Sequence, residues 1–258
     1  MKKVIAIILT AMMVLSLAAC DGKEQSDSAK IKKAGKIVVG ITDFAPMDYQ
    51  EDGEWVGFDA DMAKAFAKTL GVEVEFLEIE WDSKVLELNN GTIDCVWNGM
   101  TLREDVLAAM DCSNAYCNNA QIVIVPAAEA DKYRTVDDIK GLTFAVEAGS
   151  AGKDMAEELG VQYTEVLAQA DALMEVKAGT SQAAIIDSLM AAAMVGEGTS
   201  YADLTYTTPL NSEEYGVGFR KGSDLVEKLN QFFKDSYADG SMMECAEKYG
   251  VQAAIIPQ

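Results

Sequence analysis

Residues 93–102, Ile-Asp-Cys-Val-Trp-Asn-Gly-Met-Thr-Leu, are the stretch from which the rest of the chain can be read. It opens with the apolar and β-branched residues of a buried strand, and Asn98-Gly99 is expected to end that strand. Residues 101–104, Thr-Leu-Arg-Glu, then have the spacing of a capping box that opens a helix. Such a junction points backbone N–H groups and the positive end of a helix dipole at the space above the sheet, so it is a candidate anion-binding site.

Strands and helices alternate on both sides of this stretch, as they do in a parallel α/β sheet. Before it, the sequence predicts strands at residues 36–41 and 72–79 with a helix at 60–70 between them. After it, a second alternating set runs from residue 142 to residue 195. We therefore predict an α/β fold with parallel sheets in two lobes, each with its own core, and a ligand cleft between the lobes.

The two alternating sets also predict where the lobes divide. Lobe 1 is expected to comprise residues 36–124 and 212–258, and lobe 2 residues 125–211. Two crossings, near 123–127 and 207–215, would join them. The helices that close the chain are expected to return to lobe 1, which makes that lobe discontinuous in sequence.

The start of the chain has the pattern of export and anchoring. Residues 1–20 carry a positive flank and then an apolar run that is short for a membrane span, as in a secretory signal peptide. The run ends in Leu-Ala-Ala-Cys, which resembles the lipobox of bacterial lipoproteins and implies lipidation of Cys20. Residues 21–35 are expected to be a solvated tether. Together they predict an extracytoplasmic protein held at the cell membrane by lipid.

Composition excludes several classes of function. The net charge of −21 is opposite to the basic patches that nucleic-acid binders need. There is no histidine, which excludes Ser-His-Asp and Cys-His catalysis and histidine metal sites, and we predict no catalytic residue, metal or cofactor. Cys112 and Cys117 are close enough in sequence to bond, but a small-hydrophobe role fits each equally well, so the sequence leaves this open.

Three strand ends carry candidate ligand contacts, because open α/β sheets bind ligands beyond the carboxyl ends of their strands. The first is Asn98-Gly99-Met100-Thr101, and the second is Glu147-Ala148-Gly149-Ser150, where the serine can cap the next helix. The third is Asp187, which follows Ala-Ala-Ile-Ile and can act as a helix cap or as a ligand carboxylate. N–H groups from one lobe and a carboxylate from the other would complement a zwitterion.

The large aromatic residues divide between core and pocket. Trp97 lies within a strand and is expected in the core. Phe44 and Trp81 lie in loops that follow strands, where burial is less expected, so we predict that they line the pocket. For Glu147 the sequence leaves two roles open, contact with a cationic group of the ligand and a solvated strand end.

The order of these motifs resembles the extracellular solute-binding proteins of polar amino-acid ABC transporters, family 3. The resemblance covers roughly residues 36–250. Its motifs are, in order, Phe44-Ala45-Pro46, Gly57-Phe58-Asp59-Ala60-Asp61-Met62-Ala63, Trp81-Asp82, Gly91-Thr92-Ile93-Asp94, Asn98-Gly99-Met100-Thr101, Ser113-Asn114-Ala115-Tyr116, Gly149-Ser150, Asp187 and Tyr215-Gly216-Val217-Gly218-Phe219-Arg220-Lys221-Gly222. It implies a two-lobed periplasmic-binding-protein-like fold of type II, acting as a monomer that captures a ligand and delivers it to a membrane permease.

The resemblance also implies site residues. By resemblance, Gly99 and Thr101 hold the α-carboxylate of an amino acid, Ser150 assists from the second lobe, and Asp187 takes the α-ammonium, while the two loop aromatics line the side-chain pocket. The ligand-binding residues predicted in all are Phe44, Trp81, Asn98, Gly99, Thr101, Arg103, Gly149, Ser150 and Asp187. The expected ligand is a small polar amino acid or a related amine.

Two positions depart from the family pattern. The family usually has an arginine five residues beyond the threonine, where it pairs with the α-carboxylate, and this chain has Val106 there. The hydroxyl residue common after Ser150 is Ala151 here. Arg103 shares a helix face with Val106 and is a candidate substitute, although a solvated surface role fits it equally well.

The alternative function is a dehydratase-like enzyme on the same scaffold, with Glu147 or Asp187 as the acid.

Overall fold

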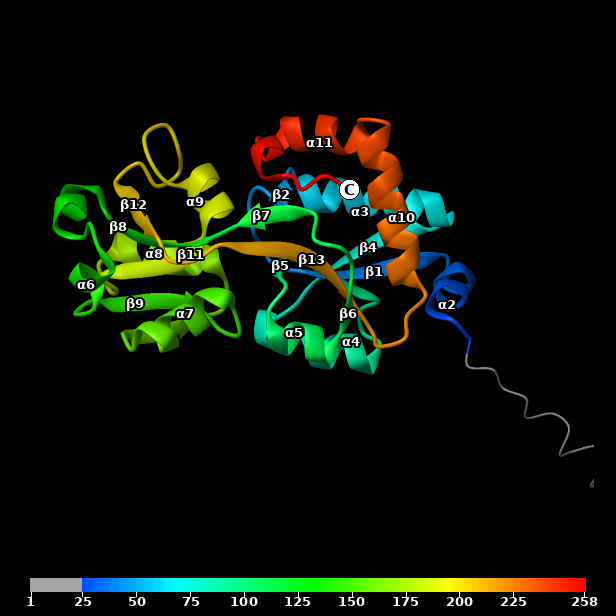
Figure 1. The fold of residues 1–258 in the computed structure, drawn as a ribbon, viewed down its shortest axis with the longest axis horizontal. Helices are drawn as coiled ribbons and strands as arrows, with labels where there is room; N and C mark the ends of the chain where they lie inside the picture. Colours follow the sequence, from blue (N-terminus) through cyan, green and yellow to red (C-terminus); the bar gives the residue numbers. More distant parts are fainter. Residues whose placement is uncertain (1–24) are drawn as a thin grey trace, which may run out of the picture.

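The computed structural model describes residues 25–258 and shows two α/β lobes side by side, joined by two strand connections (Figure 1). Each lobe is built on one sheet with helices on both faces. Cys20 and the predicted signal peptide lie outside the described residues. None of the helices between residues 25 and 258 is both long and apolar enough to cross a bilayer.

The sheet of lobe 1 has the order β4–β1–β5–β13–β6, with β7 also pairing β13. Its strands are β1 (Lys36–Ile41), β4 (Glu73–Glu78), β5 (Cys95–Thr101), β6 (Asp111–Cys112), β7 (Cys117–Asn119) and β13 (Glu213–Phe219). β1 is parallel to β4 and β5, whereas β13 is antiparallel to β5, β6 and β7. The sheet is therefore mixed rather than parallel throughout, because β13 enters it from lobe 2 in the opposite direction.

Helices cover both faces of this sheet. On one face α3 packs against β1, β4 and β5, and α11 packs against α3 and α10, so the closing helices do return to lobe 1 (Figure 1). The other face carries α4 and α5 (Figure 1). The bounds are α2 (Asp27–Ala34), α3 (Phe58–Leu70), η1 (Trp81–Ser83), α4 (Lys84–Asn90), α5 (Glu104–Ala109), α10 (Leu225–Ala238), α11 (Ser241–Tyr249) and η3 (Gln252–Ala254), with a hairpin of β2 (Tyr49–Glu51) and β3 (Glu54–Val56).

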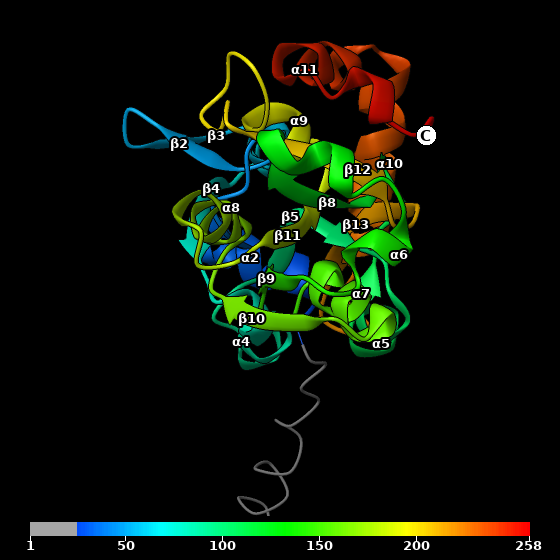
Figure 2. The same ribbon diagram turned by 90° about the vertical axis from the view of Figure 1, so that its left-hand side faces the viewer.

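The sheet of lobe 2 has the order β10–β9–β11–β8–β12 and is also mixed. β9 is parallel to β10 and β11, while β8 is antiparallel to β11 and β12. The elements are β8 (Gln121–Pro126), η2 (Ala127–Lys132), α6 (Val136–Ile139), β9 (Thr143–Glu147), α7 (Ala151–Leu159), β10 (Gln162–Val166), α8 (Gln169–Ala178), β11 (Ala183–Asp187), α9 (Ser188–Met194) and β12 (Leu204–Pro209). Figure 2 looks onto the end of this lobe, with α7 and α8 beside β9 and β11.

The first crossing between the lobes lies earlier than predicted. β7 pairs with β13 in the first sheet and β8 pairs with β11 in the second, so the chain crosses at Ala120. A boundary between residues 124 and 125 would cut through β8, whose whole length hydrogen-bonds in lobe 2. The second crossing lies between β12 and β13, within the predicted range of 207–215.

Three local expectations are wrong. The predicted tether at 21–35 contains α2, which is fixed because Ile31 is buried and Asp27 forms an ion pair with Arg220. Asn98-Gly99 does not end a strand, since β5 continues through both residues to Thr101. Nor does Thr101 cap a helix: α5 begins at Glu104, and its N-cap residue, Arg103, makes no side-chain capping hydrogen bond.

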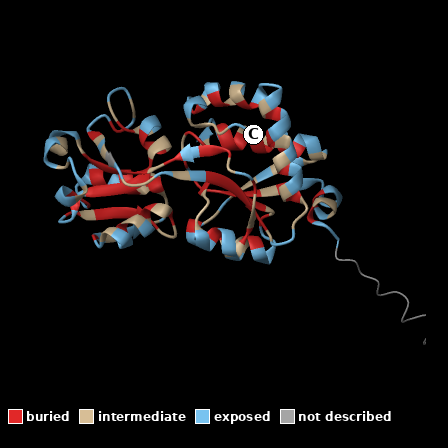
Figure 3. Ribbon diagram, viewed as in Figure 1, coloured by how far each residue is buried: buried red, intermediate tan, exposed pale blue. Residues whose placement is uncertain are grey.

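The cores of the lobes are not separate either. One cluster of buried side chains includes Trp97 and Phe233 of lobe 1 together with Leu173 and Ile186 of lobe 2, because the lobes are packed against one another. Two smaller clusters fill the remaining face of each sheet. Figure 3 shows this arrangement, with buried strands at the centre of each lobe and the exposed faces of the helices outside.

Candidate ligand-binding site

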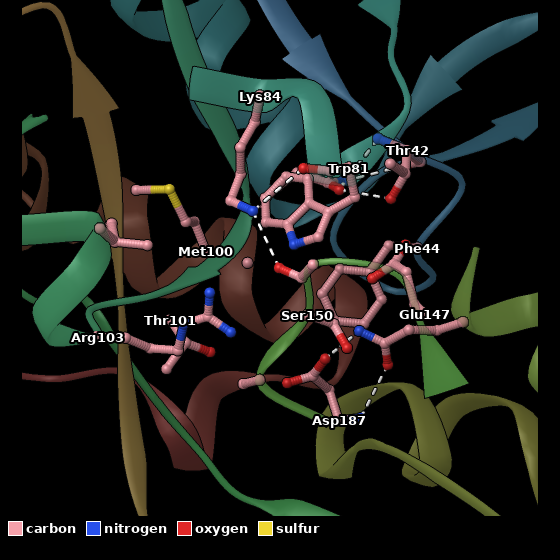
Figure 4. A pocket seen from close by; sticks show the side chains of 16 residues that line it. Thr42, Phe44, Trp81, Lys84, Met100, Thr101, Arg103, Glu147, Ser150 and Asp187 are labelled. Atoms are coloured by element: carbon pink, nitrogen blue, oxygen red, sulfur yellow. Dashed lines mark hydrogen bonds between the residues drawn. The ribbon is translucent and has the colours of Figure 1, made fainter. Parts of the chain in front are cut away.

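A pocket lies between the lobes, beyond the carboxyl ends of β1, β5, β9 and β11 (Figure 4). Its unfilled cavity has a volume of about 20 Å³, which is room for about one water molecule. The residues that line it are Thr42, Phe44, Trp81, Lys84, Asn98, Gly99, Met100, Thr101, Arg103, Val106, Glu147, Gly149, Ser150, Ala151, Gln169 and Asp187. The fold thus brings all nine predicted site residues to one pocket, and their contacts with a ligand stay predictions.

The aromatic side chains divide as the sequence predicted. Phe44 and Trp81 line the pocket, where Phe44 packs edge-on against Tyr215 with ring centroids 6.4 Å apart. Trp97 is buried in the core and contacts Phe66 and Phe233 instead. Strand position explains the difference, because the side chain of Trp97 leaves the middle of β5 toward the helices that cover the sheet.

Asn98 and Gly99 form the wall of the pocket on lobe 1, but their polar groups are already used. The amide of Asn98 donates to Asp48 at 2.8 Å and accepts from the hydroxyl of Thr42 at 2.7 Å. The N–H of Gly99 donates to Asp59 Oδ2 at 2.7 Å, so it is not free to bind a carboxylate as predicted. Only glycine fits position 99, because its φ is +54° and a Cβ would lie 2.3 Å from the ring of Phe44.

Thr101 lies at the end of β5 and contacts the strand that returns from lobe 2. Its hydroxyl donates to Glu213 Oε1 at 2.9 Å. The helix dipole invoked at this junction starts further along the chain, at Glu104, and belongs to the six-residue helix α5. The anion site is therefore not built as the sequence suggested, because β5 continues where a helix was expected.

On lobe 2, Gly149 and Ser150 make the turn that the sequence predicts. Ser150 is the N-cap of α7, and its Oγ accepts from the N–H of Lys153 at 3.1 Å. Gly149 has a φ of +68° and lies against lobe 1, where a Cβ would be 2.6 Å from Asp82 Oδ1. The lobes therefore meet at this turn.

Asp187 is buried at the end of β11, in the N-cap position of α9, but its side chain makes no capping hydrogen bond. Its carboxylate accepts from Asn119, Gln169, Gln121 (2.8 Å) and Tyr215 (3.0 Å). The crossing strands and α8 thus supply neutral hydrogen-bond donors to Asp187 in the absence of ligand. Burial, and next the adjacent charge of Glu213, raise the pKa of Asp187.

Arg103 lines the pocket with its guanidinium in two ion pairs. Nη2 lies 2.9 Å from Asp105, and Nη1 lies 2.9 Å from Asp154 on α7 of lobe 2. Arg103 is therefore a bridge between the lobes in this closed arrangement. Val106, where the family resemblance implies an arginine, is buried in an apolar cluster with Trp81 and Met100.

Sequence reasoning missed Lys84 and left Glu147 undecided. Lys84 begins α4, is 5% exposed, and its Nζ donates to the carbonyl oxygens of Trp81 (3.1 Å) and Gly149 (3.0 Å). Glu147 ends β9, is 3% exposed, and its Oε1 has no hydrogen-bond partner among the described residues. The position of Lys84 directly after Trp81-Asp82-Ser83 was a usable signal, because a helix that starts at the pocket carries its first side chains there.

Burial changes the ionisation of both groups. It raises the pKa of Glu147 to about 8, with the nearby Asp187 as the next cause. It lowers the pKa of Lys84 to about 8, with the positive charge of Arg103 as the next cause. The pocket thus holds two basic side chains from lobe 1 opposite two acidic side chains from lobe 2.

No cysteine is among the described residues that line this pocket. Cys95, Cys112, Cys117 and Cys245 are all free thiols, which settles the question of a bond between Cys112 and Cys117 in this structure. Among residues 25–258 no group of three or more histidine, cysteine, aspartate or glutamate side chains is placed to hold a metal ion.

Comparison with known proteins gives one consistent result. Residues 37–252 match the model of the bacterial extracellular solute-binding proteins, family 3. The chain is 30% identical to the arginine-binding extracellular protein ArtP of Bacillus subtilis, over 96% of this chain and 98% of that protein.

Solved structures agree with this match. A histidine-bound substrate-binding protein of an ABC uptake transporter from Streptococcus pneumoniae superposes with a TM-score of 0.82 at 30% identity, covering 89% of this chain and 98% of that one. The ancestral amino acid-binding protein AncCDT-1, a precursor of cyclohexadienyl dehydratase, gives a TM-score of 0.80 at 30% identity, with coverage of 87% and 99%.

Proposed function

Because the chain belongs to the bacterial extracellular solute-binding proteins of family 3, we propose that it captures a small polar amino acid, or a close relative carrying an amine, between its lobes. It would deliver this ligand, as a monomer, to the permease of an ABC transporter. Relatives named for arginine and histidine support an amino acid as the ligand.

One observation carries the proposal: the pocket places carboxyl groups on one wall and cationic groups on the other. Glu147 and Asp187 come from lobe 2, and Lys84 and Arg103 from lobe 1 (Figure 4). A zwitterion can satisfy both walls at once, whereas a simple anion can neutralise only the cationic wall and an uncharged sugar neither wall. Since buried charges are costly without partners, these walls favour a ligand with both signs.

The chain is a binding protein rather than an enzyme, as its family and its relatives show. The dehydratase-like alternative required an acidic residue in the cleft, and Glu147 has the raised pKa such an acid needs. Even so, the neighbour whose name mentions a dehydratase is itself described as an amino acid-binding protein.

The test of the ligand class is a thermal-shift screen, followed by calorimetry, over amino acids, their amides, amines, short peptides, sugars and inorganic anions. We expect stabilisation by one or a few amino acids. Stabilisation by sugars or amine-free anions alone would refute the proposal, and loss of ligand with appearance of product would favour the enzyme.

We also propose that a lipid on Cys20 anchors the protein to the membrane. Cys20 in Leu-Ala-Ala-Cys and the polar residues after it support lipid anchoring outside the cytoplasm. We expect Cys20→Ala to release the protein into the medium or to leave an unprocessed precursor, measured by fractionation and mass spectrometry. A Cys20→Ala protein that is processed and retained on membranes like the parent would refute anchoring at this residue.

A further inference from the structure

We propose that Lys84 binds the carboxylate of the ligand, so that the pocket selects amino carboxylates over the matching amides and amines. This inference deepens the proposed function and rests on it. The position that the family resemblance assigns to a carboxylate-binding arginine holds Val106, packed among apolar side chains. A ligand carboxylate would therefore need a cation from elsewhere in the pocket, or backbone N–H groups alone.

Within the described part of the chain, the contacts of Lys84 leave one N–H donor of its ammonium group without an acceptor. The side chain is 5% exposed, and Nζ donates to only two oxygens, the carbonyls of Trp81 and Gly149. It forms no ion pair with any carboxylate of residues 25–258, although an ammonium group has three N–H donors. A buried ammonium group with neutral partners alone is costly, and a carboxylate would supply both the third acceptor and the opposite charge.

The alternative cation, Arg103, is already committed. Its guanidinium pairs with Asp105 on its own lobe and with Asp154 across the cleft. A ligand carboxylate would be the third to share this guanidinium, of which Nη1 makes no hydrogen bond within residues 25–258 despite lying 2.9 Å from Asp154. Lys84 has no such competitor, so the balance of charges favours Lys84.

The position of Lys84 also suits a zwitterion. Figure 4 shows its side chain descending along Trp81 into the pocket, with Asp187 on the opposite wall. Nζ lies 4.7 Å from the centroid of the Trp81 ring, which holds the ammonium group beside the aromatic wall. A ligand with its ammonium at Asp187 and its carboxylate at Lys84 would span the pocket from lobe 2 to lobe 1.

The charged groups around Lys84 provide a second test, a change in protonation when the ligand binds. Burial and Arg103 lower its pKa, and the carboxylates of Glu147, Asp105 and Asp82 oppose that shift. A ligand carboxylate would raise the pKa of Lys84, so binding near pH 8 should take up protons at this residue. Calorimetry in two buffers of different ionisation enthalpy measures the net proton change, and the difference between the parent and Lys84→Met gives the part taken up at Lys84.

The decisive experiment compares Lys84→Met with Arg103→Met, which removes the other pocket cation in the same way. The probes are the common L-amino acids and their C-terminal amides, titrated by calorimetry into each full-length variant. We expect the parent to prefer the acid. We expect Lys84→Met to lose about tenfold or more in affinity for the acid and much less for the amide, because both can accept a hydrogen bond from Lys84 but only the acid also forms an ion pair with it.

Other results of this experiment would refute either the role of Lys84 or the proposed function itself. If Lys84→Met weakens acid and amide equally, Lys84 acts in lobe closure and the inference is wrong. The inference is also wrong if Arg103→Met, rather than Lys84→Met, abolishes the preference for the acid. If no amino acid binds the parent, the proposed function fails and the inference falls with it. Lys84→Arg, which keeps the charge, should retain the preference, and ligand-free thermal unfolding verifies that each variant folds.

Discussion

Asp187 carries the clearest prediction at the scale of single residues. Its carboxylate is held by the side chains of Asn119, Gln121, Gln169 and Tyr215, and we propose that it also meets the ligand ammonium. We expect Asp187→Asn to weaken ligand binding by about 2–5 kcal/mol, the range for truncating one partner of a buried charge pair. Calorimetry with the ligand found in the screen measures the loss.

An N-acetylated ligand is the control for Asp187, because it lacks the ammonium group. The parent should reject it, and Asp187→Asn should discriminate much less between the free and the acetylated forms. Since Asn cannot accept all four hydrogen bonds, some loss of ligand-free stability is expected as well. Equal discrimination in parent and variant would show that the ammonium binds elsewhere.

The raised pKa of Glu147 predicts that the free energy of unfolding depends on pH. Its folded-state pKa of about 8 lies above the ordinary value of about 4.3 for glutamate, so the folded protein holds a proton that the unfolded chain releases. The free energy of unfolding therefore falls as the pH rises between these values, by up to about 1.4 kcal/mol per pH unit from this group alone. The charges that face it, Asp187, Asp171 and the opposing Lys84, are part of this balance.

The variant Glu147→Gln tests this dependence, since glutamine keeps the shape and loses the titration. Urea unfolding of the ligand-free protein from pH 5 to pH 8.5 should give a flatter curve for the variant, with higher stability than the parent at the alkaline end. Asp187 also has a raised pKa, so part of the slope should remain. A slope identical to that of the parent would show that Glu147 is ionised throughout this range.

At the scale of elements, the turn between β9 and α7 controls how closely the lobes approach. Gly149 has a φ of +68°, and a Cβ there would meet Asp82 of lobe 1 at 2.6 Å. We expect Gly149→Ala to weaken ligand binding about tenfold or more, because the closed form must open slightly to admit the methyl group. Calorimetry of ligand binding measures this effect.

Gly160, which ends α7, provides a matched control. Its φ of +67° is nearly the same, but a Cβ there would meet nothing within 4 Å. Gly160→Ala should therefore cost about 1–2 kcal/mol of stability from backbone strain and leave ligand affinity unchanged. If the two variants weaken ligand binding alike, the contact between Gly149 and Asp82 does not govern closure.

At the scale of the whole molecule, the structure predicts a closing motion. Arg103 and Asp154 are paired across the cleft, Lys84 reaches the carbonyl of Gly149, and the remaining cavity of about 20 Å³ is too small to admit an amino acid. A ligand must therefore enter an open form and favour the closed one, since only there do both walls contact it. Small-angle scattering should show a smaller radius of gyration at saturation, and an unchanged radius would contradict closure.

The sequence alone determined the architecture because its signals are local and repeated. Alternating apolar periods, turn residues and strand ends give two α/β lobes, and all nine predicted site residues line one pocket. Motifs such as Gly149-Ser150 also fixed a turn and a helix cap, because a φ above zero and a capping hydroxyl are read from two adjacent residues.

Only the tertiary structure decided which groups in the pocket are free. The N–H of Gly99 is used by Asp59, Arg103 is used by Asp154, and the hydroxyl of Thr101 is used by Glu213. These partners are 40 to 112 residues away or on another lobe, so no local pattern announces them. Lys84 shows the reason most directly, because this first residue of α4 becomes a buried pocket cation only when a turn 65 residues later in the chain closes over it.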